Sequence, residues 1–220
     1  MSARLSDNLK KIWARAAGTA AAAVAFGSLY FFVRQYFKDG LWRFDLSILN
    51  KSLGTAALFL VALSMFLTGA AYFSGPSKRP LAFRKYYGLA GFWTAAVHAA
   101  VNHFALPAAG LHPERKIDAL TTDLPALAGL VILGAMALLS SSRAKGRLGG
   151  EAWRKTLRYG GYAALLLVLA HTVLLKGASW IKYFRTFDPV LPSLSLPVAA
   201  FAAAAVVLRL AVWAAQARKK

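Results

Sequence analysis

The sequence contains no cysteine, which excludes disulfides, iron–sulfur clusters and thiolate metal sites. Acidic residues are also scarce: 8 Asp and Glu stand against 27 Lys and Arg, for a formal net charge of +19. Only 16% of residues are charged and 58% are hydrophobic, which is too apolar for an ordinary soluble domain. A basic chain can bind nucleic acid or anionic lipid, and here the apolar runs favour lipid.

Six apolar runs are long enough to cross a bilayer, which takes roughly 20 mostly apolar residues. They cover residues 16–37, 53–73, 86–106, 124–142, 159–175 and 194–214. The linkers between them contain Gly, Pro, Asp and Lys, and no second domain is evident. The pattern predicts an all-α integral membrane protein, a bundle of six transmembrane helices that forms a single membrane domain over residues 1–220.

The distribution of basic residues predicts the orientation of this bundle, since short cytoplasmic loops are rich in Lys and Arg. Six spans place eighteen of the 27 basic residues on one side. These are Arg4, Lys10, Lys11, Arg15, Lys78, Arg79, Arg84, Lys85, Arg143, Lys145, Arg147, Arg154, Lys155, Arg158, Arg209, Arg218, Lys219 and Lys220. Both termini are therefore expected on the cytoplasmic side, and we expect the bacterial inner (plasma) membrane.

Two histidines lie deep inside apolar runs that begin in the same way. His98 follows Tyr86 by twelve residues, His171 follows Tyr159 by twelve, and a basic cluster precedes each tyrosine. At 1.5 Å per residue both lie ~18 Å from the cytoplasmic boundary, hence at one depth. An ionisable residue inside a membrane is a functional candidate, and two imidazoles at one depth suit the two faces of one haem iron.

Small residues accompany both histidines. Gly91 and Gly88 precede His98 by seven and ten residues, and Ala164 and Gly161 hold the same positions before His171. This spacing predicts a cleared strip on each helix where a flat macrocycle could lie. The alternative is that the two histidines are unrelated buried residues and that the small residues serve helix packing.

The other two histidines fit the same iron less well. His103 follows His98 by five residues, about 140° around the helix, so it cannot reach the iron from the same face. We expect it at the interface, hydrogen-bonded with Asn102, or near a haem propionate. His112 stands beside Pro113 in an outer loop, where it is expected to be solvated.

The stretch Arg84-Lys85-Tyr86-Tyr87-Gly88-Leu89, followed by His98, resembles the third helix of the ferric-reductase-like transmembrane domain superfamily. Within that superfamily the likeness is closest to the MsrQ (YedZ) family, haem-binding membrane subunits of the periplasmic methionine sulfoxide reductase system. The basic stretch 147–153, with Leu157 and His171 beyond it, is similar to that family's basic loop and fifth helix. Residues 54–56 and the apolar run after them resemble its second helix.

This resemblance implies a six-helix protein with haem b that carries electrons across the membrane, from a flavin or quinol source to a periplasmic oxidoreductase. His98 and His171 would be the metal ligands. Two-haem members carry a second histidine about thirteen residues before each of these, where this chain has Lys85 and Arg158. One haem is therefore expected. The Arg-Pro pair common at the start of the fourth helix is replaced by Thr121-Thr122-Asp123.

Basic and aromatic residues crowd the cytoplasmic starts of the two histidine helices. Arginine pairs with phosphate, and aromatic faces stack on flavin or quinone rings. We expect a flavin phosphate (FMN) or a quinone head group there, bound by Arg84, Lys85, Tyr87, Trp153, Arg154 and Arg158. The positive-inside rule and an interfacial aromatic belt would produce the same composition without any ligand.

Two functions of different classes remain open. The first is a haem b electron-transfer subunit, an oxidoreductase component rather than a complete enzyme. It would take electrons from a cytoplasmic flavin reductase or the quinone pool and pass them to a periplasmic partner such as a methionine sulfoxide reductase; a stand-alone ferric or quinone reductase is a variant of it. The second is a non-redox membrane transporter or assembly protein. The absence of evident internal repeats and of mid-span prolines disfavours a transporter.

Overall fold

The structure is a computed structural model that describes residues 2–74, 79–111 and 119–218. All regular elements in these ranges are helices. They are α1 (Ser2–Asp39), α2 (Leu46–Phe73), α3 (Arg79–Ala100), the π-helix η1 (Val101–Ala105), α4 (Leu106–Ala108), α5 (Ala119–Leu139), α6 (Ser142–Leu148), α7 (Gly150–Thr186) and α8 (Ser195–Ala217). The chain is an all-helical membrane protein, as its composition predicts.

Five described helices are long and apolar enough to cross a membrane: Leu9–Asp39 of α1, α2, Leu120–Leu139 of α5, α7 and α8. The predicted span 86–106 falls in α3, η1 and α4, which are not among these five. The first turns of α3 carry Arg79, Arg84 and Lys85, and the helix gives way to η1 at Val101, so its apolar stretch is short. The other predicted runs lie almost wholly within α1, α2, α5, α7 and α8.

Two helices extend far beyond their predicted apolar runs. The first begins at Ser2 rather than near residue 16, and α7 covers Gly150–Thr186 rather than 159–175. Lys and Arg are good helix formers, so the charged turns outside the apolar run continue the helix. A search for apolar runs therefore locates these helices but underestimates their length.

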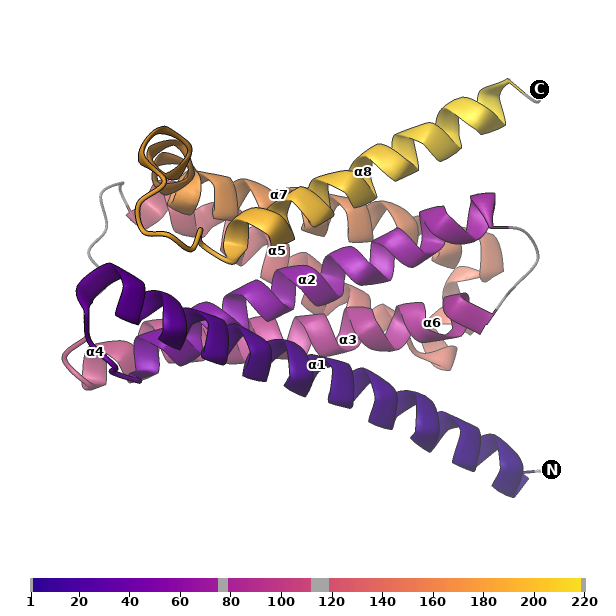
Figure 1. The fold of residues 1–220 in the computed structure, drawn as a ribbon. Coiled ribbons are helices and arrows are strands. Elements are labelled where there is room, and N and C mark those ends of the chain that lie inside the picture. The colour runs from indigo at the N-terminus through magenta and orange to yellow at the C-terminus, as the bar shows by residue number, and fades with distance from the viewer. Residues whose placement is uncertain (1, 75–78, 112–118, 219–220) are drawn as a thin grey trace.

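The second helix occupies the middle of the bundle, where it packs on α1, α3 and α8, while α5 packs mainly on α7. Its buried residues Leu58, Val61 and Met65 join residues of α5, α7 and α8 in one core cluster. Figure 1 shows both termini, the C-terminal end of α2, the N-terminal end of α3 and α6 at one end, which we call the basic end. The α1–α2 connection and α4 lie at the opposite end, and α1 and α8 diverge toward their termini (Figure 1).

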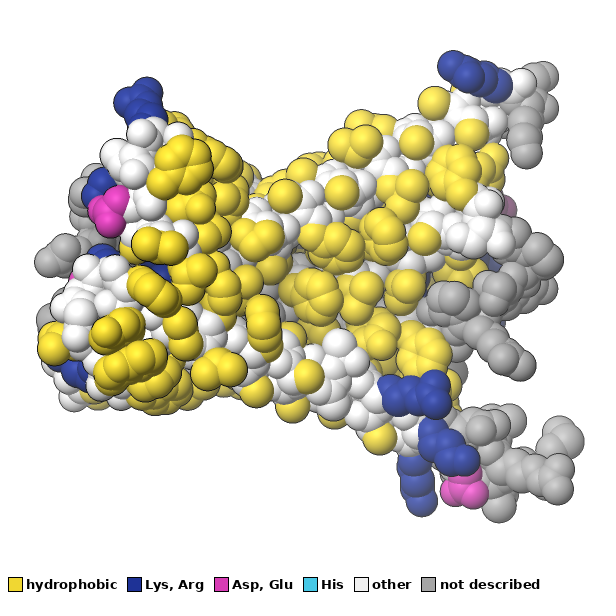
Figure 2. All heavy atoms as spheres, in the orientation of Figure 1, with side chains coloured by type: hydrophobic (Ala, Val, Ile, Leu, Met, Phe, Trp, Pro, Cys, Tyr) yellow, Lys and Arg dark blue, Asp and Glu magenta, His cyan; other side chains and the backbone are white. Residues whose placement is uncertain are grey.

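Apolar side chains cover the middle of the molecule, and dark-blue basic side chains appear toward its ends (Figure 2). Large exposed hydrophobic residues lie on several helices, among them Phe26, Trp93, Val131, Leu166 and Val207. In water this surface would be unfavourable, whereas lipid acyl chains cover it at no cost. The surface agrees with a multi-pass membrane protein.

Candidate functional site: two histidines held by neighbouring helices

His98 lies near the C-terminal end of α3 and faces the beginning of α2. Its Nδ1 is 3.0 Å from the backbone oxygen of Asn50 and 2.8 Å from the Asn50 side-chain oxygen. A carbonyl oxygen can only accept, so Nδ1 carries the proton and donates. In the neutral ring, the lone pair is then on Nε2, the atom that is left to coordinate a metal.

Asn50 is fixed from its other side, because its amide nitrogen donates to the Asn102 side-chain oxygen at 3.3 Å. Asn102 belongs to η1, and single π-turns are frequent at functional sites. Gly54, one turn further along α2, leaves room for the ring: a Cβ there would lie 2.9 Å from Cε1 of His98. One face of α2 thus orients and accommodates the imidazole.

His171 is held in the same way by the beginning of α5. Its Nδ1 lies 2.6 Å from the backbone oxygen of Thr122, a residue that is only 1% exposed. This acceptor again requires Nδ1 to donate, which leaves the Nε2 lone pair for coordination.

The two histidine helices lie across the bundle from each other, since α3 and α7 each pack on α2 and α5 rather than closely on one another. The imidazoles of His98 and His171 interact electrostatically. Asn50 is in the second turn of α2 and Thr122 is in the first turn of α5, and both helices begin at the end opposite the basic end. Both histidines therefore lie toward the end opposite the basic end, and their equal depth in the membrane stays a prediction.

The small residues that precede the histidines do not leave an open strip, because side chains of α2 pack against Gly91 and Gly161. A Cβ at Gly91 would lie 2.8 Å from Val61 of α2, and one at Gly161 would lie 2.7 Å from Met65. Ala164 is fully buried in the core. These small residues allow helices to approach closely, which is their common use in membrane bundles. The glycine that gives room to a histidine ring is Gly54.

The six residues predicted to bind a flavin or quinone do not form one group. Lys85 donates to the Ser140 backbone oxygen at 2.8 Å, and the Trp153 indole donates to that of Leu139 at 2.7 Å. Both bonds fix the C-terminal end of α5. Tyr87 packs near Phe83, with ring centroids 6.1 Å apart, and Arg154 is exposed at the start of α7.

Arg84 and Arg158 lie apart from these four residues, next to Tyr162 and Arg209, which the sequence did not mark as site residues. Arg84 interacts electrostatically with the other three. We call Arg84, Arg158, Tyr162 and Arg209 the arginine cluster. Arg209 was counted as a loop charge in the sequence, although it lies within α8 eight residues before the helix ends. A lone arginine inside an apolar run is the signal that could have identified it.

A groove of about 460 Å³ opens between α1, α3 and the C-terminal end of α5. Its lining includes aromatic residues of α1 and α3 and polar groups of α3 and the α5–α6 turn, among them Trp13, Lys85, Tyr86, Trp93 and Ser140. The Trp13 and Tyr86 rings meet edge to face, with centroids 5.1 Å apart. Tyr86 therefore lines this groove, whereas Tyr87, which was predicted to bind the ligand, does not.

The remaining histidines differ from His98 and His171. His103 is exposed in η1 and interacts electrostatically with His98, while His112 lies outside the described residues. No group of three or more His, Asp or Glu side chains that could hold a metal ion occurs in ranges 2–74, 79–111 and 119–218. A metal held by two imidazoles needs no such group. No family model matches the chain, and no curated protein is significantly similar to it.

Proposed function

We propose that this protein binds one haem b through His98 and His171 and carries electrons across the membrane. The observation that supports this most directly is the matched state of the two imidazoles: each Nδ1 donates to a carbonyl oxygen, so each Nε2 has its lone pair. Metal-binding histidines generally donate the other ring nitrogen in this way, which fixes both tautomer and ring orientation. The donor set thus fits the group.

Haem b, when bound, supplies a reversible one-electron iron couple. Asn50 and Thr122 orient the imidazoles, and their hydrogen bonds raise the basicity of the two ligands. His98 and His171 together would leave the iron no open coordination site, so oxygen binding is not expected. The role of the chain is to hold the ligands, exclude water and set the potential, as a component of an oxidoreductase rather than a complete enzyme.

Two lysines near the histidines are suited to the haem propionates. Lys51 follows Asn50 and lies three residues before Gly54, on the face of α2 that His98 contacts. Lys176 follows His171 by five residues and interacts electrostatically with Lys51. Together they place two ammonium groups toward the end opposite the basic end, where the propionates would need them.

For the topology we propose six spans, with α3, η1 and α4 together forming the one whose apolar stretch is short. Both termini would lie in the cytoplasm, because the basic end holds most of the Lys and Arg side chains. The histidines then lie toward the outer face of a bacterial inner membrane. A cytoplasmic flavin reductase or the quinone pool would supply electrons, and a periplasmic oxidoreductase, such as a methionine sulfoxide reductase, would accept them.

The groove beside Trp13 and Tyr86 is the place where a quinone head group would fit at the basic end. Its aromatic side chains can stack on a flat ring, and Lys85 and Ser140 supply polar groups at its rim. Of the six residues predicted to bind a flavin or quinone, Lys85 would thus contact the quinone head group. Trp153 supports that site by fixing the end of α5.

An optical spectrum of the purified protein, recorded with and without dithionite, tests this function. We expect a Soret band that shifts on reduction, and its complete loss in His98→Ala and in His171→Ala. His112→Ala is the control and should keep the band. A wild-type protein without a Soret band, after expression with ample haem, would contradict the proposal.

A further inference from the structure

The arginine cluster joins three helices toward the basic end. Arg84 comes from α3, Arg158 and Tyr162 stand one turn apart on α7, and Arg209 comes from α8. The Arg209 guanidinium lies 5.8 Å from the centroid of the Tyr162 ring and 5.1 Å from that of Trp213. Tyr162 interacts electrostatically with all three arginines. The cluster is therefore a single group of side chains.

Two members of the cluster are buried, and each has a polar atom without a hydrogen-bond partner among the described residues. Arg209 is 5% exposed and Tyr162 is 7% exposed. Within the described part of the chain, the Arg209 Nε and the Tyr162 hydroxyl have no hydrogen-bond partner. Buried polar groups in folded proteins are almost always paired, so this position lacks an acceptor.

The cluster also lacks a counter-charge. Among the described residues, no carboxylate is an electrostatic partner of Arg84, Tyr162 or Arg209. Tyr162 and Trp213 offer ring faces to the guanidinium, but a ring face does not accept its in-plane N–H groups. Buried cations without a paired anion are strongly unfavourable. The described residues thus supply the cationic half of a site.

We propose that the arginine cluster binds a phosphate group, and that an anionic phospholipid on the side of the basic end provides it. Arginine binds phosphate through two parallel N–H bonds, and the Tyr162 hydroxyl can donate to a third oxygen. Basic pockets between transmembrane helices on the cytoplasmic side are known to hold anionic lipid head groups.

The surroundings of the cluster favour lipid over a soluble phosphate. The neighbours of Arg209 on α8 include Val207 and Leu210, which are 63% and 52% exposed. Beside Tyr162, the ring of Tyr159 is also exposed on α7. Acyl chains attached to a bound head group would cover this apolar surface. Because this apolar surface beside the cluster already faces lipid, a lipid head group is the phosphate nearest to it.

Thermal unfolding of the full chain in detergent, after removal of bound lipid, tests the proposal. The ligands to add separately are phosphatidylglycerol, phosphatidylcholine with the same acyl chains, FMN and inorganic phosphate. We expect phosphatidylglycerol to raise the melting temperature of the wild type and phosphatidylcholine to leave it nearly unchanged. Arg209→Gln should weaken the response to phosphatidylglycerol by about tenfold or more in concentration, because it removes charge-assisted hydrogen bonds.

Arg218→Gln, an exposed arginine at the end of the same helix, is the matched control and should respond as the wild type does. Without lipid, Arg209→Gln should be at least as stable as the wild type, since an unpaired buried charge is gone. Equal responses of Arg209→Gln and wild type, or no response to any phosphate, would overturn the proposal. An Arg209-dependent response to FMN or inorganic phosphate alone would support the phosphate site and overturn lipid as its source.

This inference does not depend on the proposed haem. The Soret band should survive in Arg209→Gln, and the response to phosphatidylglycerol should survive in His98→Ala. The two proposals can therefore fail separately.

Discussion

The histidine site and the arginine cluster lie toward opposite ends of α3 and α7. They differ in whether their polar atoms have hydrogen-bond partners. At the histidine site, the described residues satisfy the Nδ1 atoms of His98 and His171 and the amide of Asn50. In the arginine cluster, the Arg209 Nε and the Tyr162 hydroxyl have no acceptor in the part of the chain that the structure describes. At the first region each Nε2 keeps its lone pair while the other polar atoms named here are paired, whereas the second region has buried donors without acceptors among the described residues.

This difference indicates how each region would bind its ligand. The histidine site is preorganised, because hydrogen bonds from α2 and α5 hold the imidazoles before any metal arrives. In the arginine cluster the guanidinium groups repel one another, and we expect a bound anion to relieve this repulsion. Loss of the metal should therefore cost the first region little stability, and loss of the anion should cost the second region much more.

The largest expected effect on this comparison comes from filling the space beside His98. In Gly54→Val, the Cβ would lie 2.9 Å from Cε1 and 3.1 Å from Nε2 of His98, so the ring must move out of its place. We expect haem content to fall close to zero while the protein still inserts. Gly18→Val in α1, where nothing lies within 4 Å, should retain normal haem content. Full haem content in Gly54→Val would contradict the assigned ring position.

Removal of the orienting amide should have a smaller effect. Asn50→Ala keeps the backbone acceptor of His98 but removes the side-chain acceptor at 2.8 Å. Changes of this kind typically lower metal affinity by about 10–100-fold. Haem titration should show this loss, and the midpoint potential should shift. Asn102→Ala removes only the partner of Asn50, so its effect should be weaker; an equal or larger effect would contradict this order.

In the arginine cluster, removal of a polar group should weaken ligand binding without destabilising the ligand-free protein. Tyr162→Phe removes a hydroxyl that has no partner among the described residues. The free energy of unfolding of the lipid-free variant should therefore be higher than that of the wild type, or lower by no more than about 1 kcal/mol. Stabilisation by phosphatidylglycerol should become smaller, because one phosphate donor is lost. A clear loss of stability without lipid would show that the hydroxyl already has a protein or water partner.

The sequence predicts the histidines, the helix order and the basic end because these follow from apolar runs and charge counts. It could not reveal Thr122 as the partner of His171, since a backbone carbonyl has no residue signature. Nor could it separate Lys85 from Arg84, which are neighbours in the chain but point to different helices. The small residues below the histidines have the same spacing for a cofactor as for helix packing, and packing proved to be their role.

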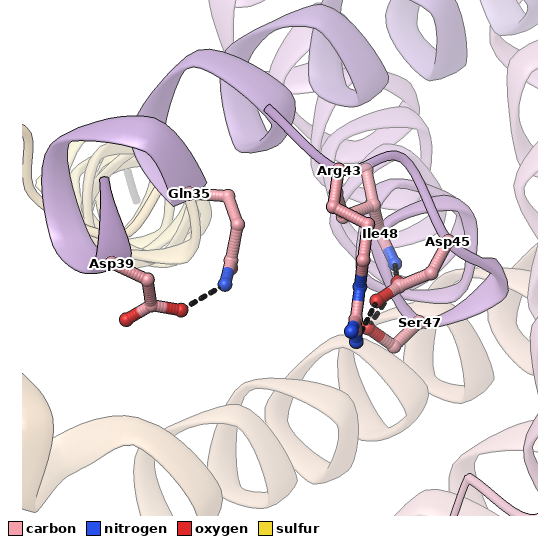
Figure 3. Close-up of polar contacts among 6 residues, drawn as sticks. All are labelled: Gln35, Asp39, Arg43, Asp45, Ser47 and Ile48. Carbon is pink, nitrogen blue, oxygen red and sulfur yellow. Dashed lines mark hydrogen bonds and ion pairs between the residues drawn. The ribbon is translucent and has the colours of Figure 1, made fainter. Parts of the chain in front are cut away.

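The smallest expected effect concerns Asp45, which begins the helix that carries Asn50. Its side chain accepts from the amide of Ile48 and the hydroxyl of Ser47, and Arg43 pairs with its second oxygen; Gln35 and Asp39 form a separate contact nearby (Figure 3). This is the normal role of an N-cap residue, and its loss usually costs about 1 kcal/mol. Asp45→Ala should therefore lower the melting temperature slightly.

The charge of Asp45 adds a dependence on pH. Burial of the carboxyl opposes its ionisation, but the hydrogen bonds from Ser47, Ile48 and Arg43 outweigh burial and hold the pKa of Asp45 below its usual value. A lowered folded-state pKa means that the carboxylate stabilises the fold above about pH 4, and that this contribution is lost as the pH falls through the folded-state pKa. Asn also caps helices well, so Asp45→Asn should melt near the wild type at neutral pH and lose less stability in acid. Identical acid sensitivity in both proteins would mean that Asp45 acts only as a neutral cap, and that the polar groups around the histidine site are held without help from charge.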